Sequence, residues 1–84
     1  MTKYHAKIEV RLKPGHVDSE GLTAEESLRD MDFEIGGVST AKVYEIDFEA
    51  SSIAEAESLA DEMCKKLLAN PVKDDYEIEV EEAE

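Results

Sequence analysis

Polar and apolar residues alternate along three separate stretches of the chain, which predicts three half-buried strands. The first stretch covers residues 3–12, the second 40–49 and the third 76–81. Each would present one apolar face to a core and one charged face to solvent. The first is predicted to end at Lys13-Pro14-Gly15-His16, because proline cannot donate to a strand ladder and glycine relaxes the turn.

A short helix is predicted between the first two strands. Thr23 and Glu26 have the spacing of a capping box, which places the helix start at Thr23. Gly36-Gly37 argues against a long continuation. The apolar stripe of this helix is Ala24, Leu28 and Met31.

A second, better marked helix is predicted between the last two strands. Ser52 and Glu55 form another capping box. The helix must end at Asn70, because a residue that precedes a proline is pushed out of the helical region. Its apolar stripe, at spacings of three and four, is Ile53, Ala56, Ala60, Met63 and Leu67.

Charge predicts which strands are neighbours. The outward residues of the last strand are all acidic, and three acids also face outward on the middle strand. Like charges directly opposite each other are unfavourable, and only the first strand offers outward cations, Lys7 and Arg11. The first strand is therefore predicted to pair with the last.

These elements predict a two-layer α+β fold in one domain, residues 1–84. The order is β-α-β-α-β, a ferredoxin-like half, with both helices on one face of a small sheet. Residues 34–48 could form one long strand or a hairpin. A domain this small buries only roughly 60 to 65 per cent of its unfolded surface. We therefore expect a homodimer or homotetramer in which a second copy extends the sheet.

The formal net charge of −13 at pH 7 makes nucleic acid an unfavourable partner, since phosphate binding depends on Lys and Arg. The charge also disfavours an anionic membrane surface. No apolar run is long enough to span a bilayer, and no signal peptide is recognised at the start of the chain. A single cysteine, Cys64, suits a reducing compartment, so a cytoplasmic location is expected.

The residues with reactive side chains form no recognisable catalytic or metal-binding motif. Cys64 has Lys65 and Lys66 beside it, which can lower a thiol pKa, but no histidine is close in sequence to activate it. His5 and His16 have no nucleophile or acid placed beside them by a motif. We therefore expect no catalytic, cofactor-binding or metal-binding residue in this chain.

Surface for a partner remains as the expected functional feature. Val43 is an apolar residue on an otherwise charged strand face, although single exposed apolar residues are common. The two turns, before and after the helices, are further candidates, although each could be ordinary chain reversal. The candidate interface residues are Lys13, Gly15, Val43, Asn70, Pro71, Val72 and Tyr76.

Two motifs resemble the PurS family, the small subunit of phosphoribosylformylglycinamidine (FGAM) synthase. The first is Leu12-Lys13 followed by Gly15, Asp18 and Gly21. The second and more specific is Met63-Cys64 followed by Leu67–Val72 and Asp75-Tyr76. Two positions depart from the family pattern, since Ser19 stands where proline is common and Ala41 where glycine is common. Ala41 favours one long middle strand over a hairpin.

The resemblance implies a non-catalytic subunit of a glutamine-hydrolysing ligase of purine biosynthesis. In that family a glutaminase subunit (PurQ) releases ammonia, and a large synthetase subunit (PurL) uses ATP and Mg²⁺. PurS would bridge the two and support ammonia transfer, with no cofactor of its own. The alternative from a different class is a ferredoxin-like regulatory module that binds a small molecule. A thermal-shift screen discriminates them, because only the module should be stabilised by a metabolite alone.

Overall fold

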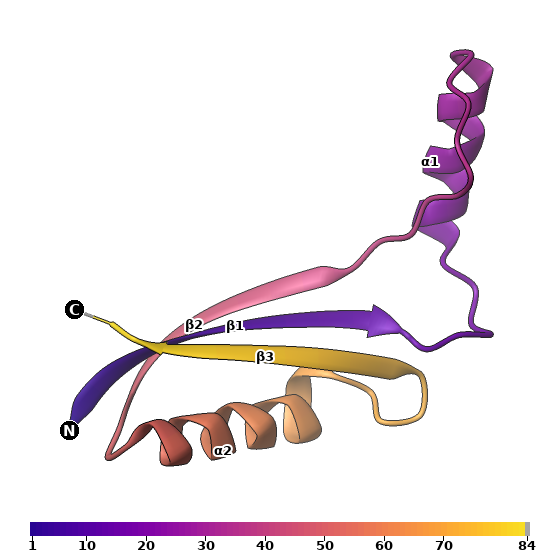
Figure 1. Cartoon of the computed structure of the whole chain (residues 1–84). Helices are drawn as coiled ribbons and strands as arrows, with labels where there is room; N and C mark the ends of the chain where they lie inside the picture. The colour runs from indigo at the N-terminus through magenta and orange to yellow at the C-terminus, as the bar shows by residue number, and fades with distance from the viewer. Residues whose placement is uncertain (84) are drawn as a thin grey trace.

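In the computed structural model, which describes residues 1–83, the elements follow the predicted order (Figure 1). They are β1 (Thr2–Leu12), α1 (Ser19–Asp30), β2 (Lys42–Ala50), α2 (Ile53–Met63) and β3 (Asp74–Glu82). A π-helical turn, η1 (Cys64–Leu68), continues α2. The α+β class and the β-α-β-α-β order are confirmed.

The strands form one antiparallel sheet in the order β2-β1-β3. In the middle strand Lys7 lies opposite Glu45 of β2 and Glu79 of β3, and Arg11 lies opposite Asp75. The cations of β1 thus separate two acidic strands. The prediction that the first strand pairs with the last is confirmed, and the charge argument also accounts for the central position of β1.

Only α2 packs on the sheet, so the prediction that both helices cover one face is wrong for α1. The strand directions explain the difference. Because β1 and β2 are antiparallel, the connection between them begins and ends at the same end of the sheet and need not cross it. Because β2 and β3 both run antiparallel to β1, they are parallel to each other. Their connection must therefore travel back along the sheet, and α2 makes this crossover.

The core lies between β1 and α2. Ala6 and Ile8 are fully buried against Ala60 and Cys64, with half-buried residues of β2 and β3 around them. A second small cluster, Tyr4, Ala50 and Ala56, continues the core towards the start of α2. The small side chains on α2 let the helix lie close to the sheet, so little apolar volume fills this core.

The start of α1 differs from the prediction, whereas the start of α2 agrees with it. The helix α1 begins four residues earlier than Thr23, because Asp18 is its cap and accepts a hydrogen bond from the amide of Gly21 at 2.9 Å. Thr23 lies inside the helix and its hydroxyl donates to the carbonyl of Ser19. The predicted cap of the second helix is confirmed, since the amide of Glu55 donates to Ser52 Oγ at 3.1 Å. Between α1 and β2, residues 32–41 contain no strand, so β2 is a single strand and not a hairpin.

Candidate partner surfaces

The chain reverses between η1 and β3 in a segment that we call the corner, residues 69–76. Asn70 organises it, because its side-chain Oδ1 accepts from the amide of Val72 at 2.9 Å. The amide of Asp74 donates to the Asn70 carbonyl at 2.8 Å, and the amide of Asn70 donates to Asp74 Oδ2 at 2.9 Å. These hydrogen bonds join the two ends of the turn and orient β3 as it leaves the helical region.

Asp61 of α2 ties the corner to the helix. The hydroxyl of Tyr76 donates to Asp61 Oδ1 at 2.6 Å, and Lys65 Nζ lies 2.8 Å from Asp61 Oδ2. The hydrogen bond from Lys65, then that from Tyr76, lowers the pKa of Asp61. The same contact raises the pKa of Tyr76, because the phenol proton is held by a carboxylate. Tyr76 is therefore committed to a contact within the chain.

The structure brings most of the sequence-predicted interface residues to one end of the molecule. Lys13 joins the corner, because its amide donates to the Lys73 carbonyl at 2.7 Å and its ammonium lies 3.2 Å from Asp75. Pro71 and Val72 are exposed there, and Gly15 follows Lys13 in a turn with φ of +93°, where glycine is favoured. Val43 is 47% exposed and lies on the opposite face of the sheet, apart from the corner.

Cys64 is fully buried in the core. Burial raises the pKa of its thiol, and the nearby charge of Asp61 raises it further. Because the thiolate is the nucleophilic form, this environment makes Cys64 less reactive than a free cysteine. Its position matches a packing role.

A second surface, which sequence reasoning missed, is the arm: residues 18–41, made of α1 and the segment that returns along it (Figure 1). Asp18 joins the two halves. Besides capping Gly21, its carboxylate accepts from the amide of Thr40 at 2.6 Å and from the Thr40 hydroxyl at 2.9 Å. The backbone hydrogen bond from Gly21, followed by those from Thr40, lowers the pKa of Asp18.

The arm is also held farther along its length. Glu25 accepts from the amide of Val38 at 3.3 Å and lies 2.9 Å from Arg29, whose guanidinium donates to the carbonyl of Ile35. At the tip Asp32 has φ of +70°, so the chain reverses there through a left-handed residue. Hydrogen bonds between α1 and the return segment thus hold the arm together, and the arm stands away from the sheet.

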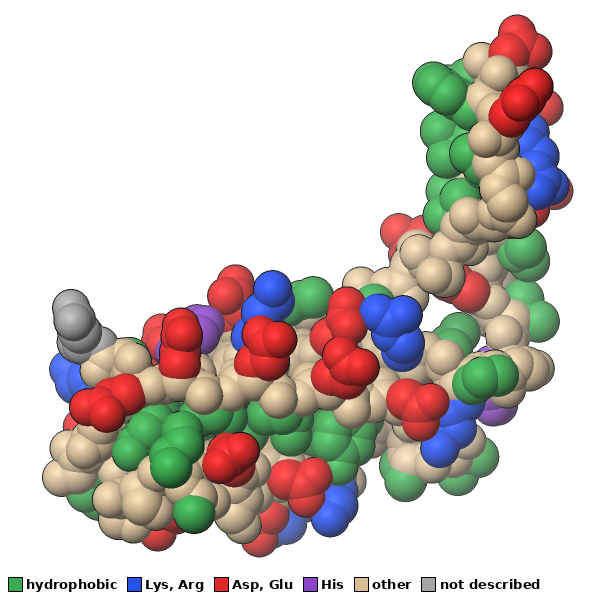
Figure 2. All heavy atoms as spheres, viewed as in Figure 1, with side chains coloured by type: hydrophobic (Ala, Val, Ile, Leu, Met, Phe, Trp, Pro, Cys, Tyr) green, Lys and Arg blue, Asp and Glu red, His purple; other side chains and the backbone are tan. Residues whose placement is uncertain are grey.

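One side of the arm is apolar and the other is charged (Figure 2). Three large apolar side chains, Leu22, Met31 and Phe33, are more than half exposed, with Leu28 and Ile35 half-buried beside them. The predicted stripe of Ala24, Leu28 and Met31 could have revealed this face. Sequence reasoning assigned that stripe to the sheet, whereas in the structure no sheet covers it.

The helix-bearing face of the sheet also has apolar residues that are not fully covered. Tyr44, Ile46 and Phe48 of β2 are only half-buried, because α2 covers the face only in part. Near the base of the arm a cavity of about 540 Å³ opens against Val10, Tyr44 and Leu68. One chain therefore carries both an uncovered apolar arm and a partly covered apolar strip of sheet.

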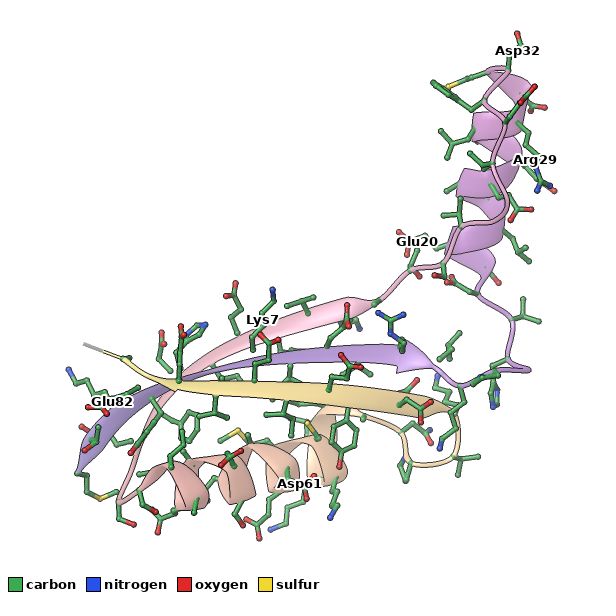
Figure 3. All side chains as sticks on the ribbon, viewed as in Figure 1. Lys7, Glu20, Arg29, Asp32, Asp61 and Glu82 are labelled. Atoms are coloured by element: carbon green, nitrogen blue, oxygen red, sulfur yellow. The ribbon has the colours of Figure 1, made fainter. Side chains whose placement is uncertain are left out.

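The third surface is the sheet face opposite α2, which we call the open face. In Figure 3, Lys7 points to this side, away from α2 and Asp61. His5 is the aromatic residue here: its Nδ1 lies 2.7 Å from Asp47 and its Nε2 lies 3.2 Å from Glu45. The hydrogen bond to Asp47, then that to Glu45, raises the pKa of His5. The other outward residues are Lys3, Glu9, Arg11, Val43, Glu49, Asp75, Glu77, Glu79 and Glu81.

The comparisons with known proteins settle the family. The profile of the PurS family, described as phosphoribosylformylglycinamidine (FGAM) synthase, matches residues 5–82. The chain belongs to the PurS family. It is 40% identical to the phosphoribosylformylglycinamidine synthase subunit PurS of Methanocaldococcus jannaschii over 82 residues, which is 96% of this chain and 99% of the relative.

Solved PurS structures share the fold as well as the sequence. The Thermus thermophilus PurS superposes with a TM-score of 0.87 at 37% identity, covering 98% of this chain and 99% of that one. A chain in the structure of PurLQS from Thermotoga maritima gives a TM-score of 0.84 at 27% identity, covering 99% of this chain and 100% of that one. The similarity to these PurS chains therefore includes the arm and the corner.

Two kinds of feature are absent from residues 1–83. Within that range no three His, Cys, Asp or Glu side chains gather closely enough to hold a metal ion. In the same residues neither helix has the length and apolar character needed to cross a membrane.

Proposed function

We propose that this chain is the small, non-catalytic subunit of FGAM synthase, the glutamine-hydrolysing ligase of purine biosynthesis. The observation that carries the proposal is the full-length similarity to a chain of the PurLQS structure. In this role the chain joins a PurL synthetase, which would hold ATP and Mg²⁺, to a PurQ glutaminase. The complex would work in the cytoplasm, where Cys64 stays reduced.

The contribution of such a subunit is positional. A bridge holds two active sites in productive alignment, so that ammonia released at one reaches the other before it is lost to solvent. The hydrogen-bonded corner and the buried, weakly reactive thiol support this role, since these residues shape a surface and a core and form no reaction centre.

We also propose that the working form is a homodimer or a larger homo-oligomer. The apolar side of the arm and the partly covered strip at Tyr44, Ile46 and Phe48 lie on the same chain, so two copies could cover each other's exposed residues. Such an exchange would bury apolar area that one chain leaves in water, and that burial is the main driving force for association.

Reconstitution tests the proposed function. The purified chain should restore glutamine-dependent formation of formylglycinamidine ribonucleotide when it is added to its own synthetase and glutaminase. Activity with ammonium salts in place of glutamine should depend much less on the chain, because free ammonia needs no transfer between sites. The proposal fails if the chain neither co-elutes with the other subunits nor changes the glutamine-dependent rate.

A further inference from the structure

We propose that the open face, and above all its β3 side, is the docking surface for a Lys- and Arg-rich patch of another subunit of the complex. The inference rests on the proposed function and adds to it the surface that is used and the chemistry of the partner. The corner shares only Asp75 with this surface, and the arm is a separate unit that stands away from the sheet.

The open face has a large excess of negative charge. Its outward residues include eight carboxylates against three Lys or Arg side chains, with His5 in addition. Two acids of β2 and one of β1 have cationic neighbours, because His5 contacts Asp47 and Glu45, and Arg11 contacts Glu9 at 2.9 Å. These carboxylates are partly satisfied within the chain.

Asp75 of β3 pairs with Lys13, but the other three outward acids of this strand are different. Among residues 1–83 no cation lies within ion-pair distance of Glu77, Glu79 or Glu81, and Glu77 faces another acid, Glu9, across the sheet. Alternate residues of a strand are about 7 Å apart, so the three carboxylates form a row at that spacing. Alternate residues of a facing strand, or residues four apart on a helix, repeat at a similar distance.

The row is bordered by two hollows that could receive side chains. One, of about 180 Å³, is lined by His5, Lys7, Glu45, Glu79 and Glu81. The other, of about 100 Å³, is lined by Lys7, Glu9, Glu77 and Glu79. Each hollow is bordered by three carboxylates and by Lys7. A guanidinium or ammonium group entering either hollow would meet acceptors on both sides, which is the geometry that charged hydrogen bonds favour.

A second copy of this chain does not fit the same surface. Two open faces placed together would oppose one excess of carboxylates with another, and juxtaposed like charges exclude a partner. Nucleic acid and anionic lipid are disfavoured for the same reason. A basic protein surface is the occupant that complements this face, and the other subunits of the complex are the proteins on which the proposed function depends.

The test compares matched double substitutions in the full chain, each removing two exposed carboxylates. Glu77→Gln with Glu79→Gln alters the row, and Glu57→Gln with Glu62→Gln alters the outer side of α2. Binding to the purified synthetase and glutaminase is measured for each variant at about 0.05 M and about 0.3 M salt, where screening differs strongly. The row variant should bind one subunit about tenfold more weakly at low salt, with a flatter salt dependence. The α2 variant should bind like the unaltered chain.

Lys7→Gln gives the opposite test, because it removes a cation that lines both hollows. This variant should bind the same subunit more tightly. Row and α2 variants of equal affinity would overturn the inference and leave the proposed function standing. An unaltered chain that binds neither subunit would overturn both.

Discussion

The two helices of this chain have similar lengths, but α2 packs on the sheet and α1 stands away from it. The helix α2 lies on the sheet with Ala56 and Ala60 fully buried, whereas in α1 the buried residue is Gly21. Both have an apolar stripe, so the stripe alone does not decide where a helix packs. The direction of the strands decides it: α2 has to cross the sheet to join parallel strands, and α1 joins antiparallel neighbours at one end. The sheet and α2 thus share a core within one chain, although part of β2 stays uncovered, whereas no sheet covers the apolar side of the arm.

The largest expected effect separates core from arm. Ile8→Ala should lower the free energy of unfolding by about 2 to 5 kcal/mol, because Ile8 is fully buried beneath α2. Leu22→Ala on the arm should change the stability of the isolated chain by less than about 0.5 kcal/mol. Urea unfolding at two protein concentrations checks both. The Ile8 effect should be present at either concentration, and any Leu22 effect should grow at the higher one, since it acts through association.

Gly21→Ala should loosen the arm and spare the sheet. A Cβ at Gly21 would lie 2.7 Å from the carbonyl oxygen of Val38 and 2.9 Å from Asp18 Oδ2, so the return segment would have to shift. We expect a local cost of about 1 to 3 kcal/mol. Hydrogen exchange should show faster exchange at the Thr40 amide with unchanged exchange in β1. Gly36→Ala is the control, because a Cβ there meets no atom within 4 Å.

Self-association should depend on the tip of the arm. Phe33→Ser, which removes a side chain that is 56% exposed, should weaken the oligomer by about tenfold through lost apolar burial. Sedimentation equilibrium measures the shift towards monomer. Leu67→Ser is the matched control, since Leu67 is 83% exposed on η1, away from the arm. Equal weakening by the two variants would mean that the arm is not the contact.

The smallest effect is one of pH, and its sign differs between the regions. The pKa of Asp18 is lowered, so its hold on the arm is present above pH 3.8 and is lost as the pH falls through the folded-state pKa. The pKa of His5 is raised, so its contribution to the sheet is full below pH 6.5 and is lost as the pH rises through the folded-state pKa. NMR titration should find His5 titrating above 6.5, and Asp47→Asn should bring the value back down.

Much of the fold could be predicted because its causes are local. Alternation indicated the strands, Ser52 capped α2 as predicted, and Asn70-Pro71 ended the helical region at the expected place. The outward cations of β1 predicted that it pairs with β3. The start of α1 was missed, because Asp18 is an equally good cap five residues upstream of Thr23. Its advantage, a carboxylate shared with Thr40, depends on a residue far along the chain.

The candidate partner surfaces were also predicted where their causes are local and missed where they depend on distant parts of the chain. Lys13, Asn70, Pro71 and Val72 were predicted from turn chemistry, and they do lie together at one end of the molecule. Tyr76 turned out to be bound to Asp61. The arm was missed because an apolar stripe does not reveal what it faces. Whether any of these residues contacts a partner stays a prediction.

By itself, the sequence determined the elements, the neighbours of β1 and the family, because these depend on periodicity, charge and motifs within short stretches. Only the tertiary structure decided that α2 packs on the sheet while α1 stands away from it. The same structure left Glu77, Glu79 and Glu81 of β3, within residues 1–83, outside ion-pair distance of any cation. These outcomes follow from strand direction and from contacts between distant residues, which no local pattern contains.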